Sequence, residues 1–410
     1  MVKPLLFFVL LASAACTLSN PFGVECVSDQ NCGCANCCIG YRCTSVGPLV
    51  GDAGPSADGG TDAGEIIDAG PLVWKVSTLA GSTRGNLNGI GAGAQFDSPS
   101  AIAIDSAGVL YVADSNNNCV RRIDSDGTVS TLAPTLLPCG GTGLADPQGV
   151  AVDGAGNVYI ASTGQNCVKV VTPAGAVEVV AGSCSQQANE CMNSPNPTRF
   201  SRPSGLAFAD PFLFVTEISS NHVRWINLRD RTAGVLAGQG FGTAVIADGT
   251  CGFTSQCLGS PSGAKFNGPG GIAAGTAGAL FVTDIYNCAL RKVVTQPGCG
   301  VTTLGRTGCP MFVNEDTRGI LKNPFGVAVG RGPLAGRAVV ADTGNNRITL
   351  VDEAGLLTPI AGTGTKGFLD GLGSEAQFQF PAGVAVDARG RVFVADSSNH
   401  RIRVLTLEAP

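Results

Sequence analysis

The sequence predicts an all-β fold, a six-bladed β-propeller, over residues 72–410. One sequence unit recurs six times, and each copy contains short runs of alternating apolar and polar residues separated by Gly and Asp. Period-two alternation with such punctuation is typical of short antiparallel strands. Up to four strands in each copy of a repeated unit are typical of propeller blades. A proline opens each unit, at Pro99, Pro147, Pro203, Pro269, Pro324 and Pro381.

The last unit shows the first three runs clearly, at residues 383–387, 392–396 and 401–404. This unit ends without a fourth run, whereas a spare run at residues 74–81 precedes the first unit. Without a partner, residues 401–404 would form an exposed sheet edge. We therefore expect residues 74–81 to complete the last blade and close the ring.

The units resemble NHL repeats, as FPAGVAVD at residues 380–387 and VFVADSSNHR at residues 392–401 illustrate. Some NHL propellers are lyases that bind zinc through three histidines, and some intracellular ones bind RNA. Other six-bladed propellers are calcium-dependent lactonases that use Glu, Asn and Asp at the channel mouth. This chain has only two histidines, His222 and His400, which cannot supply a three-histidine site. Glu217 is the odd member of its Asp series and has no recognisable partner set, so the sequence predicts no catalytic residue, cofactor or metal.

Charge excludes nucleic acid as a partner. The net charge is −5, the pI is about 5.1, and nucleic-acid binders normally present a basic surface. The basic residues of the third runs are interpreted as a solvated strand face: Arg121, Arg122, Arg224, Arg291, Lys292, Arg401 and Arg403. Four repeated aspartates that end the second runs are interpreted as turn caps that accept backbone N–H groups: Asp114, Asp284, Asp342 and Asp396.

The N-terminus predicts export. Residues 1–15 have one lysine and a short apolar run, as in a signal peptide. The following Ser13-Ala14-Ala15-Cys16 resembles the lipobox of bacterial lipoproteins, in which the cysteine is lipidated. Parity supports lipidation of Cys16, because the other 16 of the 17 cysteines form an even set. The alternative is cleavage after Ala14 and secretion without a lipid.

Residues 16–47 are predicted to form a disulfide-rich segment that follows the lipidated cysteine. In an exported chain its six clustered cysteines favour three disulfides, with connectivity that spacing leaves open. A C-x-C-x-x-C metal site is the alternative. Residues 48–71 repeat Asp-Ala-Gly and are predicted to be a flexible linker. The six cysteines are Cys26, Cys32, Cys34, Cys37, Cys38 and Cys43.

Cysteines in the propeller follow the repeat. Units one, two and four have one cysteine near the start of the third run and another after the fourth run. Units five and six have an arginine at the first place and lack the second cysteine. The joint occurrence predicts three disulfides: Cys119–Cys139, Cys167–Cys184 and Cys288–Cys309. We also predict Cys251–Cys257 within one long loop, and we assign no partner to Cys191 or Cys299.

These features favour a monomeric binding scaffold at the cell surface or in the periplasm, tethered by lipid to the bacterial outer membrane or cell surface and without enzymatic activity. Its partner is expected to be a protein or a glycan. Rigid scaffolds commonly recognise partners through loops, and the longest loops here are residues 184–199 and 238–265. The alternative is an extracellular propeller enzyme, lactonase-like or lyase-like, with its site at the channel mouth.

Overall fold

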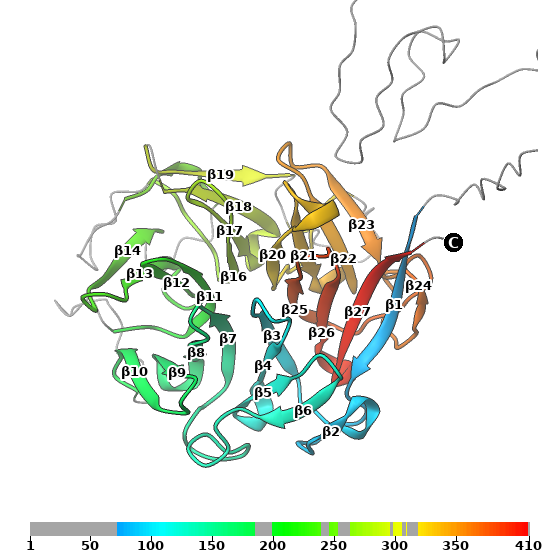
Figure 1. Ribbon diagram of the computed structural model, residues 1–410. Coiled ribbons are helices and arrows are strands. Elements are labelled where there is room, and N and C mark those ends of the chain that lie inside the picture. The colour runs from blue at the N-terminus through cyan, green and yellow to red at the C-terminus, as the bar shows by residue number, and fades with distance from the viewer. Residues whose placement is uncertain are drawn as a thin grey trace, which may run out of the picture. The chain divides into compact units, whose positions relative to one another are not determined.

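A computed structural model of the chain describes residues 72–184, 199–238, 246–252, 263–295, 298–305, 309 and 319–408 (Figure 1). All of them lie in the second of the chain's two units, Asp68–Pro410. Residues 1–71 lie outside the described residues. They include the predicted signal peptide, Cys16, the six clustered cysteines, the predicted linker and the first four residues of the second unit. The described residues form six antiparallel sheets arranged as the blades of a propeller, as the sequence predicts.

Each blade has four main strands, and three blades carry a short fifth strand at the outer edge. Blade 1 contains β3 (Pro99–Ile104), β4 (Leu110–Asp114), β5 (Cys119–Ile123), β6 (Thr128–Thr131) and the edge strand β2 (Gly89–Ile90). Blade 2 contains β7 (Pro147–Val152), β8 (Val158–Ser162), β9 (Cys167–Val171) and β10 (Val177–Gly182). Blade 3 contains β11 (Pro203–Ala209), β12 (Phe212–Glu217), β13 (His222–Asn227) and β14 (Ala233–Ala237).

Blade 4 contains β16 (Pro269–Ala274), β17 (Ala279–Asp284), β18 (Ala289–Val294), β19 (Gly300–Leu304) and the edge strand β15 (Gly249–Thr250). Blade 5 contains β20 (Val327–Val329), β21 (Ala338–Asp342), β22 (Arg347–Val351) and β23 (Leu357–Ala361). Blade 6 contains β25 (Pro381–Val386), β26 (Val392–Asp396), β27 (Arg401–Glu408), β1 (Val73–Ala80) and the edge strand β24 (Gly371–Leu372).

The ring closes as predicted, through pairing of the two ends of the described chain. Strand β1 lies antiparallel to β27, from Val73 opposite Glu408 to Ala80 opposite Ile402, and it is the blue strand beside the red one in Figure 1. Strand β24 then covers the other edge of β1. Blade 6 is therefore built from both ends of the domain, so its outer strands leave little exposed edge.

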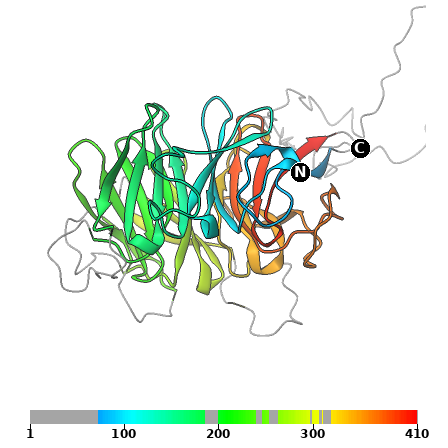
Figure 2. The same cartoon turned by 90° about the horizontal axis from the view of Figure 1, so that it is seen from below.

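Neighbouring blades stack face to face around the axis (Figure 2). Apolar side chains fill the spaces between them. At the closing interface, Phe96, Ile102 and Val112 of blade 1 pack with Phe393 and Ile402 of blade 6. Alternating strand residues point to opposite faces of a sheet, so each blade contributes one set of side chains to each neighbour. The core is accordingly a ring of inter-blade clusters.

The innermost strands come very close together around the axis. A Cβ at Gly149 would overlap the carbonyl oxygen of Ser204 in the next blade, and Gly205, Gly271 and Gly326 face the same restriction. Glycine is therefore required by the close approach of backbones. The channel that remains holds a cavity of about 60 Å³. This cavity admits a few water molecules and is far smaller than the roughly 300–1,000 Å³ of typical ligand pockets.

A repeated hydrogen bond ties five of the six blades to the next. Four asparagines in the left-handed conformation accept the N–H of the residue before the next blade's first proline, at 2.8–3.0 Å: Asn118, Asn166, Asn221 and Asn346. At the closing interface His400 takes this position, and its Nδ1 accepts the N–H of Ser98 at 3.2 Å. A local left-handed turn thus provides the same inter-blade contact in five places.

Candidate functional site

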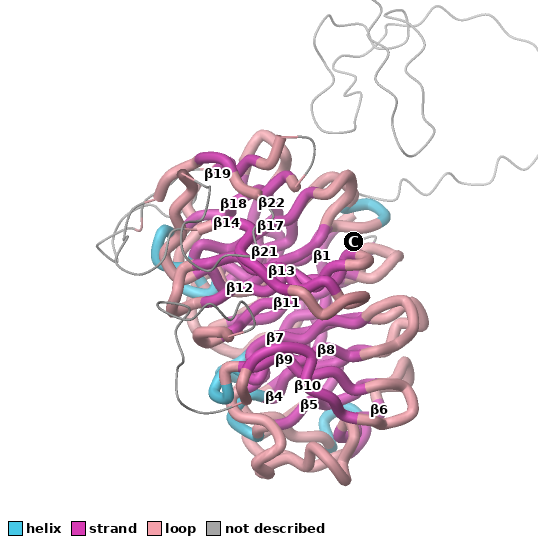
Figure 3. The backbone as a smooth tube through the Cα atoms, turned by 90° about the vertical axis from the view of Figure 1, so that its left-hand side faces the viewer, coloured by secondary structure: helices cyan, strands magenta, loops and turns pink. Residues whose placement is uncertain are grey.

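One face of the propeller carries the loops that lead from the outermost main strand of one blade to the innermost strand of the next, and we call it the loop face. Because neighbouring strands are antiparallel, the turns between second and third strands lie on this face too. Five of these turns are short 3-10 helices: η2 (Ser115–Asn117), η3 (Thr163–Gln165), η4 (Ile285–Asn287), η6 (Thr343–Asn345) and η7 (Ser397–Asn399). Figure 3 shows the propeller edge-on, with short helical turns in cyan beside the strand layers. Much of the predicted recognition loops 184–199 and 238–265 lies outside the described residues.

A buried carboxylate ends the second strand in five blades. In blade 1, Asp114 Oδ1 accepts the N–H of Asp97 at 2.7 Å, and Oδ2 accepts Asn117 Nδ2 at 2.8 Å and Arg121 Nη1 at 3.2 Å. Asp284 and Asp396 have corresponding backbone, Asn and Arg donors. The aspartates do accept backbone N–H groups, but from the loop that enters the blade rather than from their own turn. These carboxylates hold the loop face together.

Four third-strand arginines are fully buried, so their interpretation as a solvated face is wrong. Each guanidinium pairs with its blade's carboxylate and stacks on the phenylalanine three residues before the blade's proline, at 4.8–5.3 Å from the ring centroid. Strand alternation turns one residue of each basic pair inward, and Arg122 and Lys292 keep partial exposure. The stacked pairs are Arg121–Phe96, Arg224–Phe200, Arg291–Phe266 and Arg403–Phe378.

Burial sets the acidity of these carboxylates. Loss of hydration raises the pKa of Asp114 to about 6, against the opposing hydrogen bonds from Asn117, Asp97 and Arg121. Burial likewise raises the pKa of Asp284, Asp342 and Asp396. At Glu217 burial acts in the same direction, but Arg224, His222 and the N–H of Ser201 outweigh it and lower the pKa. Glu217 thus has a partner set, and it consists of groups of its own blade and the entering loop.

Three of the loops are held by the arginine of the blade they enter, and we call them arginine-anchored loops. Arg121 donates to the carbonyls of Leu87 and Gln95 at 2.9 and 2.7 Å and to Asn88 Oδ1 at 2.7 Å. Arg291 binds Asp248 and two carbonyls in the same way, and Arg403 binds Asp370 and two carbonyls. The loops are residues 82–96, 362–378 and the described part of 238–266.

The other three loops are tied by a disulfide to the blade they leave, and we call them disulfide-anchored loops. The bonds are Cys119–Cys139, Cys167–Cys184 and Cys288–Cys309, the three pairs that the repeat predicts. The predicted Cys251–Cys257 pair is wrong. Cys251 bonds Cys299, because β15 lies beside β19 and brings the two residues together across 48 positions of sequence. Cys257 and Cys191 lie outside the described residues.

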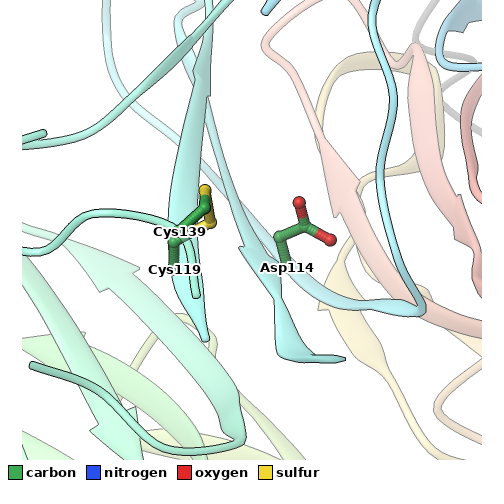
Figure 4. A group of neighbouring side chains, drawn as sticks. All are labelled: Asp114, Cys119 and Cys139. Carbon is green, nitrogen blue, oxygen red and sulfur yellow. A yellow bond between two sulfur atoms is a disulfide. The ribbon is translucent and has the colours of Figure 1, made fainter. Parts of the chain in front are cut away.

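One cluster in the described residues has the composition of a metal site, namely Asp114, Cys119 and Cys139 (Figure 4). Its two sulfurs form a disulfide and offer no thiolate, and the Asp114 carboxylate is occupied by Asn117, Arg121 and a backbone N–H. The cluster therefore does not fit a metal ion. His222 lies near Glu217 in blade 3 and His400 near Asp97 at the closing interface, so the two histidines belong to separate blades.

The mouth of the channel on the loop face has two chemically different halves. Three repeat positions lie at or beside the loop-face ends of the innermost strands: the residue before each blade's first proline, the residue after that proline, and the second residue of the turn between the second and third strands. Of these residues, Ser100, Gln148 and Phe325 line the channel cavity. In blades 1–3 these positions hold Ser98, Ser100, Asn116, Asp146, Gln148, Gly164, Arg202, Ser204 and Ser219. In blades 4–6 they hold Gly268, Gly270, Tyr286, Asn323, Phe325, Gly344, Phe380, Ala382 and Ser398. The first half is polar, and the second carries three aromatic rings.

Sequence reasoning missed these mouth residues because it examined what the units share. Tyr286, Phe325 and Phe380 each depart from the residue type at the same position in the other blades. A comparison of differences between units, made position by position, could have singled them out. Their placement around one mouth required the ring itself.

Residues 96–123 and 378–405 match the family model of the NHL repeat. The fold and these matches define a six-bladed β-propeller that contains NHL repeats. Among its relatives is NHL repeat-containing protein 2, with 26% identity to the human protein over 386 residues, or 88% of this chain and 47% of that one. The bovine protein is 26% identical over 82% of this chain and 43% of its own length. The chain thus spans less than half the length of these relatives.

Solved structures share the fold at low identity. An auxiliary nutrient binding protein from Bacteroides thetaiotaomicron is 16% identical, with a TM-score of 0.60 over 82% of this chain and 77% of that chain. A gluconolactonase from Xanthomonas campestris is 15% identical, with a TM-score of 0.52 over 83% and 99% of the two chains. In the part of this chain that the structure describes, no helix is long and apolar enough to cross a membrane.

Proposed function

We propose that this chain is an exported binding scaffold whose loop face recognises a protein or a glycan without transforming it. The observation that carries the proposal is that, on this face, one set of groups is bound within the chain and another set is exposed. The described second-strand carboxylates are bound to arginines, amides and backbone N–H groups of the same chain, whereas exposed aromatic and polar groups surround the channel mouth. Anchored loops hold those groups in place, and rigid presentation lowers the entropic cost of binding. One structural neighbour, an auxiliary nutrient binding protein, is in keeping with such a role.

Binding and turnover can be separated in one experiment. The full chain carrying Cys16→Ser, kept oxidised, is immobilised and exposed to soluble polysaccharides and to purified extracellular proteins. We expect saturable binding and recovery of the bound partner chemically unchanged by mass spectrometry. Conversion of the partner with turnover would instead support the lactonase-like or lyase-like enzyme, and the absence of saturable binding would contradict the scaffold.

Attachment to the membrane is a second part of the proposal and rests on Cys16. A thioether-linked diacylglyceryl group needs the cysteine sulfur, so Cys16→Ser should move the chain from the membrane fraction to the soluble extracellular or periplasmic fraction. The matched control is Ser13→Ala, which leaves the cysteine in place. Unchanged membrane partition of Cys16→Ser would contradict the lipid anchor, whereas a parent chain found in the soluble fraction would favour secretion after cleavage at Ala14.

A further inference from the structure

We propose that the channel mouth on the loop face binds a neutral saccharide, which stacks on the aromatic rings of blades 4–6 and hydrogen-bonds to the polar side chains of blades 1–3. The inference deepens the proposed scaffold function and rests on it. Sugar rings combine an apolar C–H face with a rim of hydroxyl groups. A mouth with one aromatic half and one polar half is complementary to both parts of such a ligand.

The aromatic half is exposed and held in place. The Tyr286 side chain is 56% exposed, and one edge of its ring packs against Gly268, where a Cβ would overlap it. Phe380 is 38% exposed, its N–H donates to Asn346 of the preceding blade, and the Lys366 ammonium lies 4.3 Å from the centroid of its ring. Phe325 lines the channel between them, on the innermost segment of blade 5. The three rings thus belong to consecutive blades of the ring.

The polar half contains two buried atoms that make no hydrogen bond within the described chain. They are Gln148 Oε1, on a residue that lines the channel cavity, and Ser204 Oγ, on a fully buried residue at the corresponding position of the next blade. Their counterpart in blade 1, Ser100, is paired with Ser115 and with the carbonyl of Pro147. Buried polar groups are normally paired, so Gln148 Oε1, which belongs to a partly exposed residue on the channel wall, points to a ligand hydroxyl or to a water molecule that bridges to it. Ser204 is fully buried and does not reach the mouth.

Charge indicates that the ligand is neutral. In the polar half Arg202 pairs with Asp146 at 3.5 Å, and beside this half Arg84 pairs with Asp97 at 2.8 Å. At the aromatic half, Lys366 lies over the Phe380 ring. A charged ligand would have to compete with these pairs, whereas hydroxyl groups need only the neutral Ser, Asn and Gln side chains. The cavity of about 60 Å³ cannot contain a sugar ring. The saccharide therefore lies across the mouth, with its hydroxyl groups directed toward the channel.

In the test variants, a residue is replaced by the residue type found at the same repeat position in another blade of this chain. Tyr286→Asn introduces the residue of blade 1, and Phe380→Asn introduces the residue of blade 5, which tolerates the left-handed backbone of Phe380. The full chain with Cys16→Ser is titrated by calorimetry with soluble neutral glucans, mannans, galactans and xylans. For the polysaccharide that binds, we expect each variant to raise the Kd about tenfold, the loss of one stacking contact. Gln148→Leu should raise it severalfold.

The matched control is Leu356→Ala, an exposed residue in the turn between β22 and β23 on the opposite face, which should leave the Kd unchanged. Melting temperatures of all variants identify any that fail to fold. If the saccharide binds but the mouth variants bind equally well, the site is wrong and the scaffold function stands. If acidic polysaccharides bind in preference, the ligand class is wrong. If no saccharide binds while a protein partner does, this inference fails and the scaffold remains.

Discussion

The arginine-anchored and disulfide-anchored loops are both held to a blade, but the two types are held to different neighbours. Arg121, Arg291 and Arg403 each hold the loop that enters their own blade. The disulfides of Cys119, Cys167 and Cys288 hold the loop that leaves their blade. Three loops are thus held by an arginine of the blade they enter and three by a disulfide to the blade they leave, and the Arg291-anchored loop carries in addition the Cys251–Cys299 disulfide. Arg224 of blade 3 also pairs with Glu217 and donates to the carbonyl of Arg199, in a loop that the Cys167–Cys184 disulfide ties to blade 2.

The difference teaches where the stability of each loop comes from. An arginine-anchored loop depends on a buried ion pair, so removing one partner leaves an uncompensated charge in the core. A disulfide-anchored loop depends on a covalent bond that restricts the unfolded chain and persists in oxidising compartments. The two devices should therefore respond differently to mutation, to reduction and to pH.

The largest effect is expected from Arg403→Met. This change keeps most of the side-chain volume but leaves Asp396 without its buried cation and frees the loop at residues 362–378. We expect a loss of about 3–5 kcal/mol in the free energy of unfolding, measured by denaturant titration. The control is Arg401→Met on the same strand, which removes a partly exposed arginine and should cost less than about 1 kcal/mol. Equal losses in the two variants would refute the anchoring role of Arg403.

A somewhat smaller effect is expected from the double substitution Cys119→Ser, Cys139→Ser. The bond closes a loop across 20 residues of sequence, which the chain-entropy model values at about 3 kcal/mol. The oxidised variant and the oxidised parent chain are compared by thermal unfolding. Unfolding free energies that agree within about 0.5 kcal/mol would show that the disulfide adds nothing beyond the packing of its loop.

Reduction of the disulfides should change hydrogen exchange in one loop type and not in the other, without any mutation. After treatment with dithiothreitol, hydrogen exchange should accelerate in residues 132–146, the loop that the Cys119–Cys139 disulfide ties to blade 1. Residues 82–96 and 362–378 should exchange at their original rates, because their arginine contacts contain no sulfur. Acceleration in all of these segments would mean that the anchors are coupled and that the comparison fails.

The smallest effect concerns pH at the end of the loop 82–96. His400 accepts the N–H of Ser98 through Nδ1, so this nitrogen must be unprotonated. Burial lowers the pKa of His400 from its usual 6.5, Asp97 opposes the shift, and Arg84 and Arg401 add to it. The unfolded chain therefore takes up the proton first as the pH falls.

The contribution of His400 to stability is thus complete above pH 6.5 and is lost as the pH falls through its folded-state pKa, a change on the order of 1 kcal/mol. Substitution His400→Asn keeps an acceptor of the type found in four other blades. Unfolding measured from pH 7.5 to 5 should show a weaker pH dependence in the variant than in the parent chain. Identical profiles would contradict the role of Nδ1 as the acceptor.

The strands, the repeat, the ring closure and three disulfides could be predicted from the sequence. Each depends on a comparison of the units at a fixed place, such as the alternation in residues 392–396, the cysteine pair present in three units, or the fourth run that the last unit lacks. The Cys251 partner could not be predicted, because only the pairing of β15 with β19 brings Cys299 near. The buried arginines were missed because alternation alone does not tell which residue of Arg121 and Arg122 faces inward.

By itself, then, the sequence determined the β-propeller, since local alternation and turn residues act over a few residues and repeat six times. The tertiary structure alone decided how the copies differ in space. It placed each arginine against the loop entering its blade, and it brought Phe325 of blade 5 and Gln148 of blade 2 to the wall of one channel. The physical reason is that these contacts join residues of different blades, and their distances are fixed only when the ring has closed.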